Sequence, residues 1–110
     1  MKVLILGFDN YKELDNKMEE LIAESGNYLF AVAAGGLSGQ TLEESLSAKW
    51  AKDKGAPLYW ITAGTGDELI RRMVQECDYV VMKITSSSPQ WHKNLLMQFK
   101  KAGKHGTVVR

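Results

Sequence analysis

The sequence predicts an α/β protein with a doubly wound, Rossmann-like sheet of five parallel strands and helices on both faces. Short apolar runs alternate with longer segments in which apolar residues recur at helical spacing, and the connections between them are short. Strict alternation of this kind favours right-handed crossovers and therefore a parallel sheet. The chain has 110 residues, the length of one typical domain, so we expect residues 1–110 to form a single Rossmann-like domain.

The first strand and the first helix are predicted from a change in hydrophobic period. Residues 3–6 form a continuous apolar run that ends at Gly7, which is typical of a strand buried on both faces. From Tyr11 to Ile22, the apolar residues fall on one helix face and the charged residues on the other. The Ser-Gly-Asn sequence at residues 25–27 is expected to end this helix.

A second strand and a second helix are separated by a glycine-rich segment. Residues 28–34 are expected to form a buried strand, which continues directly into the Gly-Gly-Leu-Ser-Gly-Gln sequence of residues 35–40. Thr41 is followed three residues later by Glu44, as in a capping box, so we expect a helix from near Thr41 to Gly55. The glycine-rich segment is therefore predicted to be a strand-to-helix turn.

The rest of the chain repeats this alternation. Residues 57–62 and 79–84 are predicted strands, and a short fifth strand is predicted at residues 107–109. Apolar residues at helical spacing mark two more helices: Leu69, Ile70, Met73, Val74 and Cys77 in the third, and Trp91, Leu95, Phe99 and Ala102 in the fourth. The fifth strand would leave part of the sheet uncovered, so we expect a homodimer.

Composition and charge exclude several classes of protein. Lysines and arginines number 14 against 13 aspartates and glutamates, and a net charge of +1 gives no basic field for duplex nucleic acid. Cys77 is the single cysteine, which excludes an internal disulfide, and no Cys/His group has metal-ligand spacing. No apolar run approaches the roughly 20 residues of a membrane span, and the apolar start is too short for a signal peptide. We therefore expect a cytoplasmic protein with no metal, cofactor or membrane partner.

The turn after the second predicted strand is the main candidate binding site. In doubly wound sheets, ligands bind at the carboxyl ends of the strands, near the point where the strand order reverses. Glycines let backbone N–H groups approach a ligand closely, and a following helix N-terminus favours an anion. We therefore expect Gly35, Gly36, Ser38 and Gly39 to hold a phosphate. The alternative is a tight turn that binds nothing.

Acidic side chains near these turns have two interpretations each. Asp9, after the first strand, is suited to hold a ribose or base edge or, like Asn10, to cap the helix that follows. Glu44 lies beside the glycine-rich turn, where a carboxylate could bind a sugar hydroxyl or act as a base on a glycosidic carbon. The alternative for Glu44 and its neighbour Glu43 is stabilisation of the helix dipole. Glu44 is thus the candidate catalytic residue, and whether the protein is an enzyme stays open.

Five further residues have both a functional and a structural interpretation. Arg71 and Arg72, in the third helix, could reach a phosphate or be solvated. Cys77 closes an apolar stripe without a basic neighbour to lower its pKa, which favours a core thiol over a nucleophile. Trp91 follows a polar loop at the predicted ligand edge, where it could stack on a base or fill the core. His92, beside it, is not a convincing metal ligand.

Four motifs along the chain match one known pattern. They are Gly7-Phe8-Asp9-Asn10-Tyr11, Ala33-Ala34-Gly35-Gly36-Leu37-Ser38-Gly39, Lys49-Trp50-Ala51-Lys52 and Gly55-Ala56-Pro57. The pattern resembles the SLOG superfamily, in particular the branch related to the bacterial YpsA protein, which includes many phage and prophage members. The resemblance places Gly7, Phe8 and Asp9 at the first ligand-binding turn. It also aligns Glu44 with the family's loop aspartate and offers Arg71 and Arg72 in place of a family arginine.

The resemblance implies a domain that binds a nucleotide or nucleotide-derived ligand at the glycine-rich turn. Relatives include cytokinin-activating phosphoribohydrolases, which makes an N-glycosidic or phosphoribosyl hydrolase with Glu44 at its centre one alternative. The Pro-Gly-Gly-x-Gly-Thr-x-x-Glu motif of those hydrolases is missing from this sequence. A second alternative is a non-enzymatic protein-interaction module. The expected partner is therefore a small nucleotide-type molecule.

Overall fold

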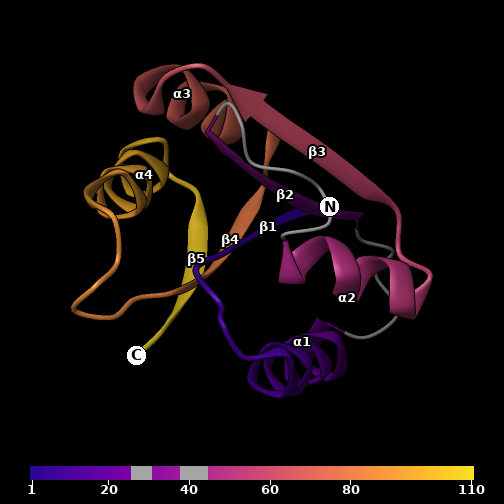
Figure 1. Ribbon diagram of the computed structural model, residues 1–110. Coiled ribbons are helices and arrows are strands. Elements are labelled where there is room, and N and C mark those ends of the chain that lie inside the picture. The colour runs from indigo at the N-terminus through magenta and orange to yellow at the C-terminus, as the bar shows by residue number, and fades with distance from the viewer. Residues whose placement is uncertain (26–30, 38–44) are drawn as a thin grey trace.

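Strands and helices alternate along the described chain (Figure 1). The computed structural model describes residues 1–25, 31–37 and 45–110. Its elements are, in order, β1 (Lys2–Leu6), α1 (Tyr11–Ser25), β2 (Ala31–Leu37), α2 (Leu46–Lys54), β3 (Leu58–Ala63), α3 (Gly66–Glu76), β4 (Tyr79–Lys83), α4 (Gln90–Lys101) and β5 (His105–Val109). This order of elements is the one that the sequence predicts.

The five strands form one parallel sheet in the order β3-β2-β1-β4-β5. β1 lies in the middle, where its apolar run from Val3 to Leu6 is buried on both faces. The chain winds outward from β1 to β3 and then returns to β4 on the other side of β1, so the strand order reverses between β1 and β4. The predicted doubly wound α/β architecture is confirmed.

Helices cover both faces of the sheet (Figure 1). On one face, α1 and α2 pack against the strands through a cluster that includes Leu14, Met18, Trp50, Val3, Ile5, Val32 and Val81. On the other face, α3 and α4 pack through a cluster that includes Leu69, Met73, Leu95, Phe99, Leu4, Val80 and Met82. Within the described ranges, no helix is long and apolar enough to span a membrane.

The cysteine belongs to the second of these clusters. Cys77 is fully buried against the sheet, and burial raises the pKa of its thiol to about 12. A thiol with so high a pKa is protonated at neutral pH and is a poor nucleophile. Cys77 is therefore a core residue, in agreement with its place in the predicted apolar stripe.

The bounds of β2 differ from the prediction. The strand begins at Ala31 and ends at Leu37, whereas the sequence predicted a strand over residues 28–34. Of the predicted strand, residues 28–30 lie outside the described part of the chain. The strand therefore ends three residues later than expected and takes in the first two glycines of the predicted turn.

Gly35 and Gly36 extend the pairing between β2 and β3. They are in register with Ile61 and Thr62 of β3, and neither glycine has a positive φ. A Cβ at residue 35 would overlap the carbonyl group of Ile61, so glycine is required there for close approach of two strands. The prediction that these two glycines form the turn itself is wrong, because both are paired with β3. At residue 35, the β3 backbone leaves no room for a side chain.

Helix α2 begins later than predicted. Ser45 is its N-cap, and the Ser45 Oγ accepts a hydrogen bond from the Ala48 N–H at 3.2 Å. The first helical residue is Leu46, whereas the capping box predicted a start near Thr41. Thr41 and its capping partner lie outside the described residues.

Helix α1 is capped by Asn10. Its Oδ1 accepts a hydrogen bond from the Glu13 N–H at 3.0 Å, and its backbone carbonyl accepts from the Leu14 N–H at 3.1 Å. These are the two bonds of an N-cap residue. Of the two predicted cap candidates, the structure therefore selects Asn10 and leaves Asp9 exposed.

Polar contacts tie α2 to α1. The Trp50 indole, 1% exposed, donates a hydrogen bond from Nε1 to Asp15 Oδ1 at 2.8 Å. The Lys54 Nζ lies 3.0 Å from the same carboxylate oxygen and 3.2 Å from Glu19 Oε1. The Trp50 hydrogen bond, followed by that of Lys54, lowers the pKa of Asp15. These contacts therefore join α2 to α1 across the surface of the sheet.

The chain leaves β1 through a turn that requires glycine. Gly7 has a φ of 85°, which is in the left-handed region. A Cβ at this position would also overlap the carbonyl oxygen of Lys83, at the end of β4. Close by, the Lys83 Nζ lies 2.9 Å from Glu13 Oε1, which ties the start of α1 to the end of β4. The positive φ and the close approach of the Lys83 carbonyl oxygen therefore both require glycine at residue 7.

We expect Gly7→Ala to lower the free energy of unfolding by about 2–4 kcal/mol, the sum of left-handed backbone strain and overlap with the β4 carbonyl. Chemical denaturation of the purified variant measures this change. Gly55→Ala is the matched control, because Gly55 also has a positive φ, 69°, but a Cβ added there would meet no atom within 4 Å. The control should lose only about 1–2 kcal/mol. Equal losses in the two variants would contradict the close-approach argument.

Candidate ligand-binding cleft

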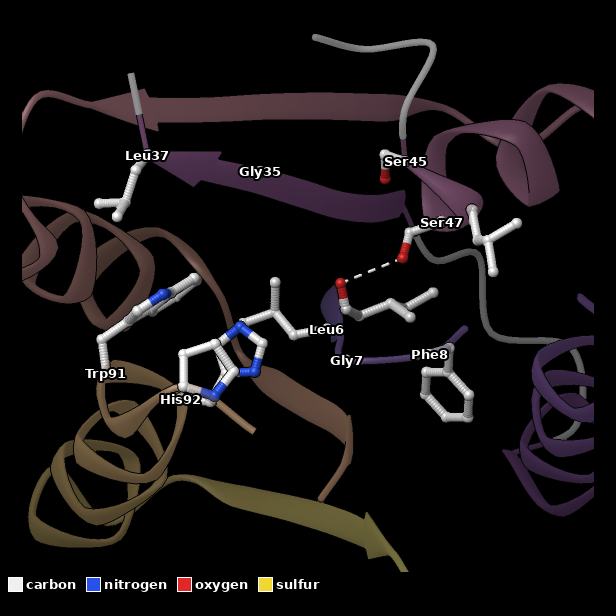
Figure 2. Close-up of a pocket in the computed structure, with 12 residues that line it drawn as sticks. Leu6, Gly7, Phe8, Gly35, Leu37, Ser45, Ser47, Trp91 and His92 are labelled. Atoms are coloured by element: carbon white, nitrogen blue, oxygen red, sulfur yellow. Dashed lines mark hydrogen bonds between the residues drawn. The ribbon is translucent and has the colours of Figure 1, made fainter. Parts of the chain in front are cut away.

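A cleft of about 450 Å³ opens at the carboxyl edge of the sheet. It is lined by the ends of β1 and β2, the start of α2 and the start of α4 (Figure 2). These segments surround the end of the central strand, which is the region where doubly wound sheets bind ligands. The cleft therefore lies at the edge where the sequence predicts the ligand site.

The cleft opens where β1 and β2 stop pairing. Their register ends at Leu4 and Ala33, although both strands continue. β1 remains paired with β4 as far as Leu6, and β2 remains paired with β3 as far as Leu37. The sheet therefore splits at its carboxyl end, with β1 on one side of the split and β2 on the other.

The split changes the partners of two backbone groups. One further step of the β1–β2 ladder would join the Gly35 N–H to the Ile5 carbonyl, but the register ends before it. Ser47 of α2 takes this place by donating a hydrogen bond from its Oγ to the Ile5 carbonyl at 3.2 Å (Figure 2). The Ala31 N–H bonds toward β1, and strand alternation gives the Gly35 N–H the same direction. The Gly35 N–H is therefore directed into the split.

The start of α2 forms a polar wall of the cleft. Ser45 and Ser47 both line it. The N–H groups of a first helical turn have no intrahelical acceptor, and the helix end carries about half a positive charge. No acidic residue occurs in the first turn of α2. Glu43 and Glu44, which precede this helix in the sequence, lie outside the described residues.

The start of α4 forms an aromatic wall. Its N-cap is Pro89, which provides no side-chain capping bond, and its first turn has no acidic residue. The Trp91 side chain lines the cleft at this wall (Figure 2). Phe8, from the turn after β1, and Leu37, at the end of β2, add further apolar surface. A flat apolar group would find contacts here.

His92 is a buried imidazole in the same wall. Its side chain is 9% exposed, and its ring stands at 83° to the Trp91 ring with the centroids 4.1 Å apart. The Nδ1 atom is buried and has no hydrogen-bond partner among the described residues. Burial lowers the pKa of His92 below its ordinary value of 6.5, so the ring is neutral at pH 7.

The lining of the cleft has no formal charge in the part of the chain that the structure describes. Its side chains are apolar, hydroxyl or neutral imidazole groups. No group of three or more His, Cys, Asp or Glu side chains in the described ranges could hold a metal ion. Recognition in this cleft would therefore use helix dipoles, backbone N–H groups and hydrogen bonds rather than ion pairs.

Three of the predicted binding residues line the cleft, namely Gly7, Phe8 and Gly35. Gly36 lies beside them in β2, but strand alternation directs its N–H toward β3. Asp9 is exposed and is not among the lining residues. The structure therefore brings together the first predicted turn and one glycine of the second.

The two predicted arginines lie on α3, away from the cleft. The Arg72 Nη1 donates a hydrogen bond to the Thr62 carbonyl at 2.6 Å, and its Nη2 is 4.0 Å from Glu76 Oε2. Arg71 lines a separate groove between α3 and α4. Neither arginine is among the residues that line the cleft. Arg72 instead ties α3 to β3.

The other predicted site residues are Ser38, Gly39 and Glu44, and all three lie outside the described residues. Their roles stay predictions. They belong to the segment that connects Leu37 to Ser45, two residues that both line the cleft. The candidate catalytic group is among them.

Sequence analysis missed the two serines and did not select His92 as a binding residue. A serine three positions before Ala48, at the start of an apolar pattern, is the usual signal of an N-cap and could have identified Ser45. No local signal identifies Ser47, because its bond to the Ile5 carbonyl depends on the split in the sheet. The burial of His92 likewise depends on how α4 packs.

We expect the stability of the protein to fall as the pH drops below about 6.5, in part through His92. The unfolded chain takes up a proton at this residue that the folded chain refuses, because burial lowers the pKa of the folded imidazole. The loss begins near the unfolded value and continues down to the folded pKa. Denaturation curves of the wild type and of His92→Asn between about pH 7.5 and pH 5 measure the effect. The variant should show a shallower decline, and parallel curves would contradict the assignment.

Known proteins offer no guide to what the cleft binds. Comparisons with protein-family models, with curated proteins and with solved structures found no match to this chain. The SLOG resemblance of the sequence motifs therefore stays a prediction. The geometry of the cleft is the basis of the function proposed below.

Proposed function

We propose that the cleft binds a nucleotide or a nucleotide-derived small molecule. The observation that carries this proposal is the convergence of two helix N-termini and the Trp91 side chain on the split between β1 and β2. A nucleotide joins an anionic phosphate to a flat aromatic base through a sugar. The cleft offers a surface suited to each end of such a molecule.

The start of α2 is suited to the phosphate. Helix N-termini bind anions through their unpaired N–H groups and their dipole. The two helices that open on the cleft, α2 and α4, have no acidic residue in their first turns. By contrast, α1 has Glu13 in its first turn, and α3 has Asp67 and Glu68. The Gly35 N–H, directed into the split, offers a further donor, so the phosphate site proposed here takes one of the two described glycines of the expected turn.

The start of α4 is suited to the base. Trp91 provides a large flat ring at the wall, and Phe8 and Leu37 provide apolar contacts around it. Leu37 is 37% exposed, which is unusual for a large apolar side chain at the end of a buried strand. Stacking of a base on an aromatic ring contributes about 1–3 kcal/mol. That amount would be sufficient to orient the ligand in a cleft whose described lining has no charged group.

The described site supports binding more than hydrolysis. An N-glycosidic hydrolase needs a carboxylate or another group that stabilises the sugar cation or activates water. No carboxylate is among the described residues that line the cleft. Glu44, which carries the hydrolase hypothesis, lies outside the described residues. Ligand binding is therefore the function that we propose.

We expect ribonucleoside 5′-monophosphates to raise the melting temperature of the protein. A ligand present at one hundred times its dissociation constant stabilises the folded state by about 2.7 kcal/mol. Differential scanning fluorimetry with nucleotides at millimolar concentration measures the shift, and inorganic phosphate and the free nucleosides separate the contributions of the two ends. If no mono-, di- or cyclic nucleotide shifts the melting temperature, the proposal fails.

We also expect a bound base to quench the fluorescence of Trp91. The chain has three tryptophans, of which Trp50 is buried against α1 and Trp60 lies on β3 outside the cleft lining. Trp91→Phe should abolish the quenching while leaving an aromatic ring in the wall. Trp60→Phe is the matched control and should keep it. Quenching that persists in Trp91→Phe would place the base elsewhere.

A further inference from the structure

A second hollow, of about 450 Å³, lies between α3 and α4 and is called the α3–α4 groove below. The two helices lie side by side on one face of the sheet (Figure 1). Ile70 and Val74 of α3 and Met97 of α4 provide the apolar surface of the groove. Met97 is 54% exposed, more than any other large apolar side chain in the described ranges. The outer side of this helix layer therefore presents apolar surface that the protomer does not cover.

Unpaired charges of opposite sign lie on the two helices that border the groove. α4 has three lysines, Lys93, Lys100 and Lys101, and no acidic residue. α3 has two acidic residues in its first turn, Asp67 and Glu68. None of these five side chains forms an ion pair with another described residue. Each helix therefore has charged groups that are available to a partner.

The apolar and charged groups of the two helices lie at matching heights. α3 and α4 run in the same direction, because each returns from the end of one parallel strand to the start of the next. Asp67 is the second residue of α3 and Lys93 the fourth of α4, so their heights differ by about 3 Å. Val74 is the ninth residue of α3, and Met97 is the eighth of α4. A twofold axis along the groove keeps these heights and lays α3 of one copy over α4 of the other.

We propose that the α3–α4 groove is the interface of a homodimer, with the twofold axis along the groove. In such an interface both copies use the same patch, so every contact occurs twice. Met97 of each copy enters the groove of the other copy beside Ile70 and Val74. Asp67 of each copy pairs with Lys93 of the other. The homodimer expected from the sequence then forms through helices and not through the open edge of the sheet.

The charge pattern favours a second copy over other occupants. A nucleic acid or an acidic peptide on this surface would be repelled by Asp67 and Glu68, and a basic peptide would be repelled by the lysines of α4. The twofold arrangement instead places acidic groups of α3 against basic groups of α4. Arg71, which also lines the groove, lies close to the height of Asn94 and would meet an amide. The surface is therefore complementary to itself.

Sedimentation equilibrium of the full chain at about 10–500 μM measures the association, and we expect the wild type to form dimers in this range. Met97→Ser should raise the dissociation constant of the dimer about tenfold or more, because symmetry removes two buried apolar groups at once. Met97→Leu keeps an apolar side chain of similar size. It should stay within about threefold of the wild type.

Charge reversal tests the relative position of the two copies. Lys93→Glu and Asp67→Lys should each raise the dissociation constant about tenfold, since each places two pairs of like charges in the interface. The double variant exchanges the charges and should return to within about threefold of the wild type. Lys12→Glu is the matched control, because it reverses an exposed lysine in the first turn of α1, on the opposite face of the sheet. It should behave as the wild type.

Three outcomes would overturn the inference. The first is a wild type that stays monomeric throughout the range, and the second is a dimer that neither Met97→Ser nor Lys93→Glu weakens. The third is a double variant that remains as weak as the two single reversals. The substituted side chains are all exposed, so the protomers should stay folded, and circular dichroism checks this. None of these outcomes bears on nucleotide binding, because different residues line the cleft and the groove.

Discussion

The carboxyl end of β1 is paired with a neighbouring strand on one side only, and the shape of the candidate site depends on this. β4 pairs with β1 as far as Leu6, whereas β2 leaves it after Leu4 and follows β3. Gly35 permits the departure, because a side chain there would overlap the β3 backbone at Ile61. The Ile5 carbonyl, which lies beyond the last β1–β2 pair, accepts a hydrogen bond from Ser47 instead. Because β2 stays paired with β3 and not with β1, the cleft opens between β1 and β2. Ser47 of α2 then bonds to β1, and the Gly35 N–H points toward the opening.

The order of elements follows from hydrophobic period, and for this reason the sequence was sufficient to predict the fold class. Runs such as residues 3–6 and stripes such as Leu69 to Cys77 are local patterns, and the structure confirms them. The end of β2 could not be predicted in this way, because glycine is equally typical of a turn and of a close strand contact. The residue that decides between them, Ile61, lies on a different strand. The contacts of Ser47 and His92 also depend on packing between distant segments.

The two walls of the cleft are held by different kinds of contact. α2 is anchored by the Trp50 and Lys54 contacts with Asp15 and by the Ser47 hydrogen bond to β1. α4 packs on the sheet through its apolar face, but its N-cap offers no side-chain bond and His92 offers an unpaired Nδ1. The wall at α2 is thus tied to the fold by side-chain polar bonds, and the wall at α4 by apolar packing.

A cleft whose described lining has no formal charge would recognise a ligand by direction more than by attraction. Ion pairs act over a Debye length of about 8 Å at physiological salt and tolerate many orientations. Hydrogen bonds from the Gly35 N–H or from the first turn of α2 require a partner within about 3 Å and near the donor axis. Each contributes only about 0.5–1.5 kcal/mol net, so tight binding requires several to form together. The polar bonds of α2 to Asp15 and Ile5 and the edge-to-face contact of His92 with Trp91 favour this, since groups that are already oriented lose little entropy when a ligand arrives.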